Sequence, residues 1–289
     1  MPSLKAIKTK IKSTGNLKKI SRALEIISTI KLQKNKAKVE SAKQYFLNLG
    51  KLIAEVSEKI DLFDTNTSIN NSKNLVIVVS SEKWLCGGLN SKLTKVLSTN
   101  YDTNTDVFVF GKKGYEFCKR SWYSIVWYCN LKDEIMQSDI TPLLLFLKDH
   151  SKEYNTITIL FNFFQSILTQ IPSEFTIQPL NKENIAHFLQ KVWIEYNQNQ
   201  KINKDFELLE PNKQAVKEEL QRQVTQYLIT ATILQNKIAE HAGRMLAMKN
   251  AKDNCTKFMS SLTLQFNKMR QANITKEISE ITGAKIAME

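Results

Sequence analysis

Two glycine-containing segments of this 289-residue chain could belong to phosphate-binding loops. One is Leu85–Asn90 (LCGGLN), shortly after the β-branched run Asn74–Ser80, and the other is Gly111–Gly114 (GKKG). A dinucleotide site needs GxGxxG at the start of a helix, and a P-loop needs GxxxxGK followed by Ser or Thr, so that the backbone can approach a phosphate. Neither segment has these spacings. We therefore expect tight turns that enter helices at both places, and no bound cofactor.

Cysteine and histidine are the other residues that could do chemistry. They are Cys86, Cys118, Cys129, Cys255, His150, His187 and His241. Cys86 lies near an expected helix N-terminus, a position that favours a thiolate, but no histidine is close to it in sequence. Because no CxxC pair occurs, we expect neither a metal site nor a disulfide framework. We therefore expect the protein to work in a reducing compartment. We expect no catalytic residue, and a packing or partner contact for His241.

Charge is concentrated at the start of the chain. The net charge is +13, and residues 1–59 supply 14 Lys+Arg against 4 Asp+Glu, or +10. A basic arm is typical of proteins that bind nucleic acid, an acidic membrane or an acidic protein, although it can also be a solvated helix face. No apolar run reaches the ~18–20 residues of a membrane span, and the lysine-interrupted start does not resemble a secretory signal.

Glycine and proline are scarce at both ends of the chain. The whole chain has 8 Gly and 5 Pro, and between Asn212 and Thr282 the only breaker is Gly243. Both ends are rich in residues that favour helices. We therefore predict an N-terminal helix in 1–60, a compact domain in 73–206 and a C-terminal helix in 207–289.

The C-terminal segment has the strongest periodicity in the sequence. Apolar residues recur on a 3.5-residue repeat over about seven heptads, which is typical of a coiled-coil seam. The predicted seam comprises Leu220, Val224, Tyr227, Leu234, Ile238, Met245, Met248, Met259, Leu262, Phe266 and Met269.

The N-terminal segment has a poorer repeat. The spacing predicts a seam at Leu17, Ile20, Leu24 and Ile27, but the same register then reaches Lys31, Lys34 and Lys38. A seam interrupted by lysines does not suit a tight homodimer. We expect the two terminal helices of one chain to pair antiparallel instead.

The central segment alternates between strand and helix patterns. Four strands are predicted, at Asn74–Ser80, Asp106–Phe110, Tyr123–Tyr128 and Thr156–Phe164, with a weaker candidate at Phe175–Ile177. The βαβ order predicts a mainly parallel, Rossmann-like sheet with right-handed crossovers. The predicted fold class is therefore α/β, with a long antiparallel coiled coil beside a Rossmann-like domain.

Motifs at both ends of the chain resemble a known family. They are Lys19–Glu25 (KISRALE) near the start, Ala242–Ala251 (AGRMLAMKNA) and Asn267–Ile278 (NKMRQANITKEI) near the end, and Leu85–Asn90 (LCGGLN) between them. Together they resemble the gamma subunit of F-type ATP synthases, in the same order and over essentially the whole chain. Where that family usually has Asp-Arg-Gly before Leu-Cys-Gly-Gly, this chain has Glu82–Trp84 (EKW).

The resemblance implies a role and partners. Such a subunit is a non-catalytic rotor shaft, present once per complex. Its coiled coil turns inside a ring of three alpha and three beta subunits, and its lower end binds the epsilon subunit and the membrane ring of c subunits. It couples ion flow to ATP synthesis or hydrolysis at the beta subunits. The implied location is the cytoplasmic face of a bacterial plasma membrane, or the matrix side of the mitochondrial inner membrane.

The resemblance also implies contacts between rotor and stator. The matching positions are Lys18, Lys19, Arg22, Leu24, Lys31, Arg270, Gln271, Thr275 and Glu277. We expect no nucleic-acid partner on this interpretation. The alternative is a basic coiled-coil scaffold or nucleic-acid-binding protein, and an enzyme with a nucleotide in the central domain ranks behind both.

Overall fold

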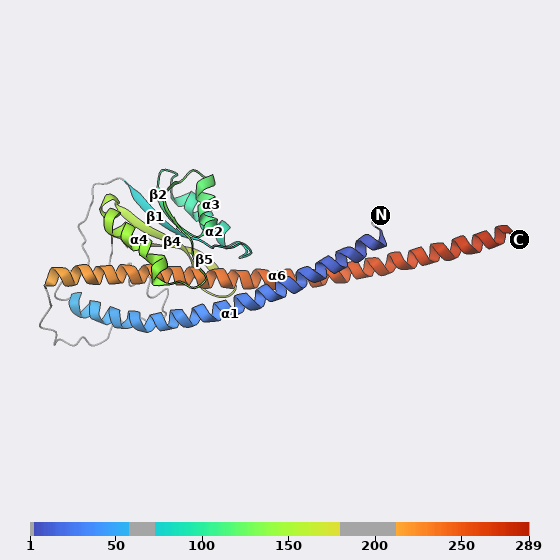
Figure 1. The fold of residues 1–289 in the computed structure, drawn as a ribbon, viewed down its shortest axis with the longest axis horizontal. Helices are drawn as coiled ribbons and strands as arrows, with labels where there is room; N and C mark the ends of the chain where they lie inside the picture. The colour runs from blue at the N-terminus through green and yellow to red at the C-terminus, as the bar shows by residue number, and fades with distance from the viewer. Residues whose placement is uncertain (1–2, 58–72, 180–211, 289) are drawn as a thin grey trace. The chain divides into compact units, whose positions relative to one another are not determined.

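A computed structural model describes residues 3–57, 73–179 and 212–288 (Figure 1). It divides into two compact units, of which one comprises Met1–Thr29 with Arg244–Glu289 and the other Ile30–Gly243. The two long helices, α1 (Leu4–Ser57) and α6 (Lys213–Met288), each contribute to both units. The expected domain boundaries at residues 60, 206 and 207 lie outside the described residues.

Unit 2 contains a five-stranded sheet in the order β3-β2-β1-β4-β5. Its strands are β1 (Asn74–Val79), β2 (Asp106–Phe110), β3 (Ser124–Cys129), β4 (Thr156–Phe164) and β5 (Gln170–Gln178). The first four are parallel, and β5 runs antiparallel to β4. The mainly parallel sheet is thus confirmed, and the weak candidate at Phe175–Ile177 belongs to a nine-residue edge strand.

Helices cover both faces of this sheet (Figure 1). The crossover helices are α2 (Leu89–Asn100), α3 (Lys112–Arg120) and α4 (Gln137–His150), with a short 3-10 helix η1 (Ser151–Glu153) before β4. Because side chains alternate along a strand, Val76 and Val78 face α2 and α3, whereas Leu75 and Ile77 face α4 and α6. The sheet is therefore buried on both sides, as its β-branched runs predict.

Part of α6 is buried on every side. Each residue from Ala231 to Gly243 is buried, although several of them are polar. A helix that is enclosed all round usually has apolar side chains, so these polar groups need partners within the protein. Among the described residues, no helix is both long enough and apolar enough to cross a membrane.

In unit 1 the N-terminal part of α1 and the C-terminal part of α6 lie side by side and antiparallel. Glu25 Oε2 accepts a hydrogen bond from Lys252 Nζ at 2.7 Å, and a Cβ on Gly15 would lie 3.7 Å from Met259 Cε. The contact therefore moves toward the N-terminus of α1 as it moves toward the C-terminus of α6. This arrangement confirms the predicted antiparallel pair.

Candidate functional site

The burial of α6 follows the predicted 3.5-residue repeat. In unit 2 the seam residues Leu220, Val224, Tyr227, Leu234 and Ile238 are buried. In unit 1, Met248 and Leu262 are buried and Met245 is half-buried, while Met259, Phe266 and Met269 are half-buried among exposed neighbours. The predicted positions thus all lie on the covered side of α6.

The seam predicted on α1 is wrong. Leu17 and Ile20 are each 56% exposed and Ile27 is 48% exposed, and only Leu24 is half-buried. The buried positions of α1 in unit 1 recur every seven residues instead, at Ile7, Thr14, Ser21 and Ser28. Short side chains let two helices approach closely, and methionine on α6 adapts to the space that they leave. A search for apolar periodicity misses a seam built from Ser and Thr.

The outward side of α1 combines cations with apolar side chains. Lys19 and Arg22 are exposed beside Leu17 and Ile20, and Lys18 is half-buried. In the isolated chain, the exposed charges of Lys19 and Arg22 therefore lie next to the solvent-exposed apolar side chains of Leu17 and Ile20. Such a mixture is typical of a surface that contacts another protein.

Lys31 differs from the other predicted contact residues because its partner lies within this chain. Its Nζ donates to Asp133 Oδ2 at 2.6 Å, and Lys83 Nζ lies 3.5 Å from the same oxygen. Burial opposes ionisation of Asp133, but the hydrogen bond and charge of Lys31, with the charges of Lys83 and Lys237, lower the pKa of Asp133 to about 2. This carboxylate is ionised at neutral pH.

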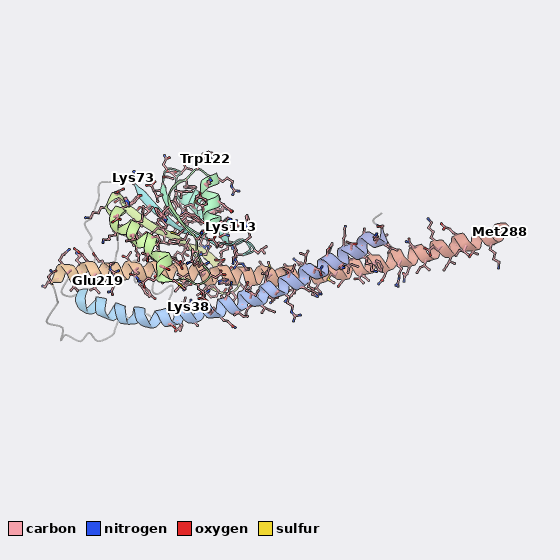
Figure 2. The ribbon with its side chains drawn as sticks, viewed as in Figure 1. Lys38, Lys73, Lys113, Trp122, Glu219 and Met288 are labelled. Atoms are coloured by element: carbon pink, nitrogen blue, oxygen red, sulfur yellow. The ribbon has the colours of Figure 1, made fainter. Side chains whose placement is uncertain are left out.

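The last turns of α6 are exposed. Every side chain described from Arg270 to the final one, Met288, is exposed, including the predicted Gln271, Thr275 and Glu277 (Figure 2). Ile274, Ile278 and Ile281 also lie in this stretch and are 47–71% exposed. α6 here continues past the N-terminal end of α1 (Figure 1), so these residues have no helix beside them in unit 1.

The LCGGLN segment packs against α6. Cys86 and Leu89 are both 4% exposed and form one apolar cluster with Ala239, and Asn90 Nδ2 donates to Cys86 Sγ at 3.3 Å. A Cβ on Gly243 would lie only 2.9 Å from the carbonyl oxygen of Cys86. The single glycine inside the buried part of α6 therefore lets this loop approach the helix closely.

The residue that departs from the family pattern has a contact of its own. The Trp84 side chain is 70% exposed, and Lys113 Nζ lies 3.6 Å from its ring centroid. Lys113 also pairs with Glu116 Oε2 at 2.6 Å. A cation over an indole face is favourable, so Trp84 joins the loop after β1 to the start of α3.

The other candidate chemical groups that the structure describes have separate environments. Cys118 is fully buried, and desolvation by burial raises the pKa of its thiol to about 12. His150 pairs with Glu153 at 2.8 Å on the surface, His241 is buried in α6, and His187 lies outside the described residues. Within the described part of the chain, no group of three or more His, Cys, Asp or Glu side chains could hold a metal ion.

Sequence reasoning missed two acids that carry much of the charge pairing in unit 2. Asp133 and Glu134 follow β3 and pair with Lys31 and Lys34 of α1. The net charge of +10 in residues 1–59 indicates that this segment needs acidic partners. Sequence spacing alone does not say that those partners lie about 100 residues away in the same chain.

Comparison with known proteins agrees with this architecture. The sequence profile of the ATP synthase family matches residues 3–288. An ATP synthase gamma chain from Staphylococcus saprophyticus is 30% identical over 302 residues, which cover 100% of both chains. An ATP synthase gamma chain from Mycoplasma mycoides is 29% identical and covers 98% of each chain.

Two cryo-EM structures have the same fold. The rotor of the Euglena gracilis mitochondrial ATP synthase superposes with a TM-score of 0.66 at 15% identity, covering 94% of this chain and 98% of that chain. A chain of the central stalk and c-ring of the Tetrahymena thermophila mitochondrial ATP synthase gives a TM-score of 0.60 at 16% identity, covering 80% and 99%. With the full-length match of the sequence profile and the bacterial relatives, these findings establish that the chain belongs to the ATP synthase gamma chain family.

Proposed function

We propose that this chain is the central rotor shaft of an F-type ATP synthase and couples rotation of a membrane c-ring to ATP synthesis or hydrolysis. The observation that carries the proposal is the antiparallel pair of α1 and α6, whose outward side carries cations and exposed apolar residues. Family membership over residues 3–288 supports the same function. It does not favour the alternative of a nucleic-acid-binding scaffold.

The proposed partners follow from this role. The coiled coil turns inside a ring of three alpha and three beta subunits, one copy per complex. The opposite end binds the epsilon subunit and the c-ring, which makes the chain a peripheral part of a membrane complex. We place it on the cytoplasmic side of a bacterial plasma membrane, or on the matrix side if the source is mitochondrial.

Catalysis in this proposal belongs to the beta subunits, and this chain has no active site of its own. Two observations support that division. The LCGGLN loop is used to pack on α6, and Cys86 is buried in that contact. Both observations give these groups a packing role on α6, which supports the proposal.

The proposed contacts with the beta subunits use Lys18, Lys19, Arg22 and Leu24 on α1 and Arg270, Gln271, Thr275 and Glu277 on α6. The exposed Leu17 and Ile20 add apolar area beside the first group. Exposed ion pairs contribute only ~0–1 kcal/mol each. Contacts of that strength can be broken and remade as the shaft turns, which a rotor requires.

We also propose that Lys31 contacts the beta subunits, but through the carbon atoms of its side chain and not through its charged ammonium group. Its ammonium is held by Asp133 at 2.6 Å, and its side chain remains 37% exposed. Long cationic side chains can present apolar stems to a neighbour while the head group is paired elsewhere.

Co-expression with alpha and beta subunits tests the proposal. We expect a purified complex with one copy of this chain for every three beta subunits, measured by native mass spectrometry. Deleting residues 270–289 should weaken the axle contact while the central domain stays folded. A chain that never co-purifies with either subunit would show that the proposed function is wrong.

A further inference from the structure

One short segment of the central domain contacts both long helices. Residues 131–134 follow β3, and we call them the acidic strap. Asp133 Oδ2 accepts from Lys31 Nζ at 2.6 Å, and Glu134 pairs with Lys34, so two successive acids meet two cations one turn apart on α1. Because these side chains lie on the same side of the helix, the strap favours one rotation and one register of α1.

The same segment contacts α6 through a buried lysine. Lys237 is fully buried, and its Nζ donates to the carbonyl oxygen of Leu131 at 3.4 Å and to Glu240 Oε2 at 3.1 Å. The Glu240 side chain is only 1% exposed. A buried ammonium without such partners would be very costly, so Lys237 holds its position against Leu131 firmly.

The base of the strap is anchored in the domain. Leu131 is 3% exposed and packs in the core between the sheet and α6, and its backbone N–H donates to Glu82 Oε2 at 3.3 Å. Lys132 Nζ lies 3.3 Å from Asp139 Oδ1 at the start of α4. Because it is anchored from both sides, the strap moves with the domain, and its contacts with α1 and α6 add to the apolar packing between the sheet and α6.

A second connection runs beside the strap and has no net charge. Asn236 Oδ1 accepts hydrogen bonds from Asn162 N at 3.1 Å and from Asn162 Nδ2 at 3.0 Å, which ties α6 to β4. This connection reaches α6 alone. The strap is a charged connection that reaches α1 through Asp133 and Glu134 and α6 through Leu131.

We propose that the acidic strap transmits torque from the central domain to the paired helices, with Asp133, Glu134 and Lys237 as its positioning residues. The inference rests on the proposed rotor function and deepens it. Hydrogen bonds and ion pairs are directional, unlike apolar contacts, so they resist sliding and twisting of one surface over another. A domain that receives torque from a membrane ring needs such a connection to turn both helices as one body.

The test compares neutralised variants in the whole ATP synthase, reconstituted in membrane vesicles. The variant Asp133→Asn/Glu134→Gln removes both strap charges and keeps the side-chain shapes. The control is Asp149→Asn, which removes one exposed acid from the C-terminal part of α4. ATP hydrolysis and ATP-driven ion uptake are measured on the same vesicles, because their ratio reports coupling.

We expect the double variant to assemble and to hydrolyse ATP at the wild-type rate. Its ion uptake per ATP should fall below the wild-type value, because α1 then follows the domain less tightly. Asp149→Asn should keep the wild-type ratio. A double variant with the same ratio as Asp149→Asn would overturn the strap proposal while leaving the rotor function intact, whereas a wild-type chain that does not assemble would overturn the rotor function itself.

A charge exchange keeps the test decisive if the double variant does not assemble. Glu134→Lys alone should lower the coupling ratio, and adding Lys34→Glu should restore it, because this pair is half-exposed and can be reversed without burying a charge. Recovery in the exchanged pair supports the strap. If Glu134→Lys leaves the ratio unchanged, or if the exchange fails to restore it, the proposal is wrong.

Discussion

The close approach of the LCGGLN loop to α6 makes Gly243 a sharp test of the packing. The change Gly243→Ala adds one methyl group, whose carbon would lie 2.9 Å from the Cys86 carbonyl oxygen and 3.7 Å from Cys86 C. Because the atom that it meets is backbone, the loop as a whole must move away. That movement disturbs the cluster of Cys86, Leu89 and Ala239.

The expected magnitude combines two opposing effects. Overfilling a packed contact costs about 1–3 kcal/mol, whereas replacing glycine by alanine inside a helix gains about 1 kcal/mol. We expect a net loss of roughly 0–2 kcal/mol in the free energy of unfolding of the central unit, unit 2. With a denaturant slope of about 2 kcal/mol per molar urea, the midpoint should fall by up to about 1 M.

Tryptophan fluorescence during urea unfolding measures this change. The three described tryptophans, Trp84, Trp122 and Trp127, lie in unit 2, so their emission follows this unit and not the ends of the long helices. The matched control is Gly283→Ala, where a Cβ would meet nothing within 4 Å. We expect the control to leave the fluorescence midpoint unchanged.

One result would refute the reasoning. If Gly243→Ala were more stable than the wild type by about 1 kcal/mol, the loop could not press on α6 as closely as the structure has it. The helix-propensity gain would then be the whole effect.

Three further changes test other contacts. Lys237→Met leaves Glu240 buried without this cation and should lower the free energy of unfolding by about 3–5 kcal/mol, measured by the same fluorescence assay. Asp133 has a folded pKa of about 2, below the ~3.9 of an unfolded aspartate, so its contribution to the free energy of unfolding is present above pH ~4 and is lost as the pH falls toward 2. The free energy of unfolding of Asp133→Asn should therefore fall less steeply than that of the wild type between these pH values. Equal pH dependence in the two proteins would contradict the pairing of Asp133. Ser21→Leu should lower the melting temperature of the helices, followed by circular dichroism, because the larger side chain overfills the α1 seam. The outward substitution Ile20→Ser should leave that temperature unchanged. A larger decrease for Ile20→Ser than for Ser21→Leu would favour the seam inferred from apolar spacing.

The sequence predicts those parts of the fold that depend on apolar periodicity. The runs at Asp106–Phe110 and Thr156–Phe164 are strands with the predicted bounds, and the 3.5-residue repeat of the C-terminal segment coincides with the covered side of α6. In these elements burial is decided by one property, hydrophobicity. Local pattern and tertiary environment therefore agree.

The parts that escaped prediction depend on close approach and on charges distant in sequence. Thr14 and Ser21 form the α1 seam because they are small, and the more apolar Leu17 and Ile20 remain outside. Lys237 is fully buried because Leu131 and Glu240 meet it in three dimensions. Neither size complementarity nor a partner about 100 residues away leaves a periodic trace in one sequence.

The central claim is that this chain rotates inside a ring of alpha and beta subunits, and direct observation of rotation tests it. Trp122 is 87% exposed on the central domain, so a Trp122→Cys variant, with the half-buried Cys129 and Cys255 replaced by serine, provides a site for a visible probe (Figure 2). With the ring fixed to a surface and ATP supplied, we predict rotation of the probe in one direction, in three steps per turn, one for each beta subunit. A probe that stays in place while the same complexes hydrolyse ATP would contradict the account.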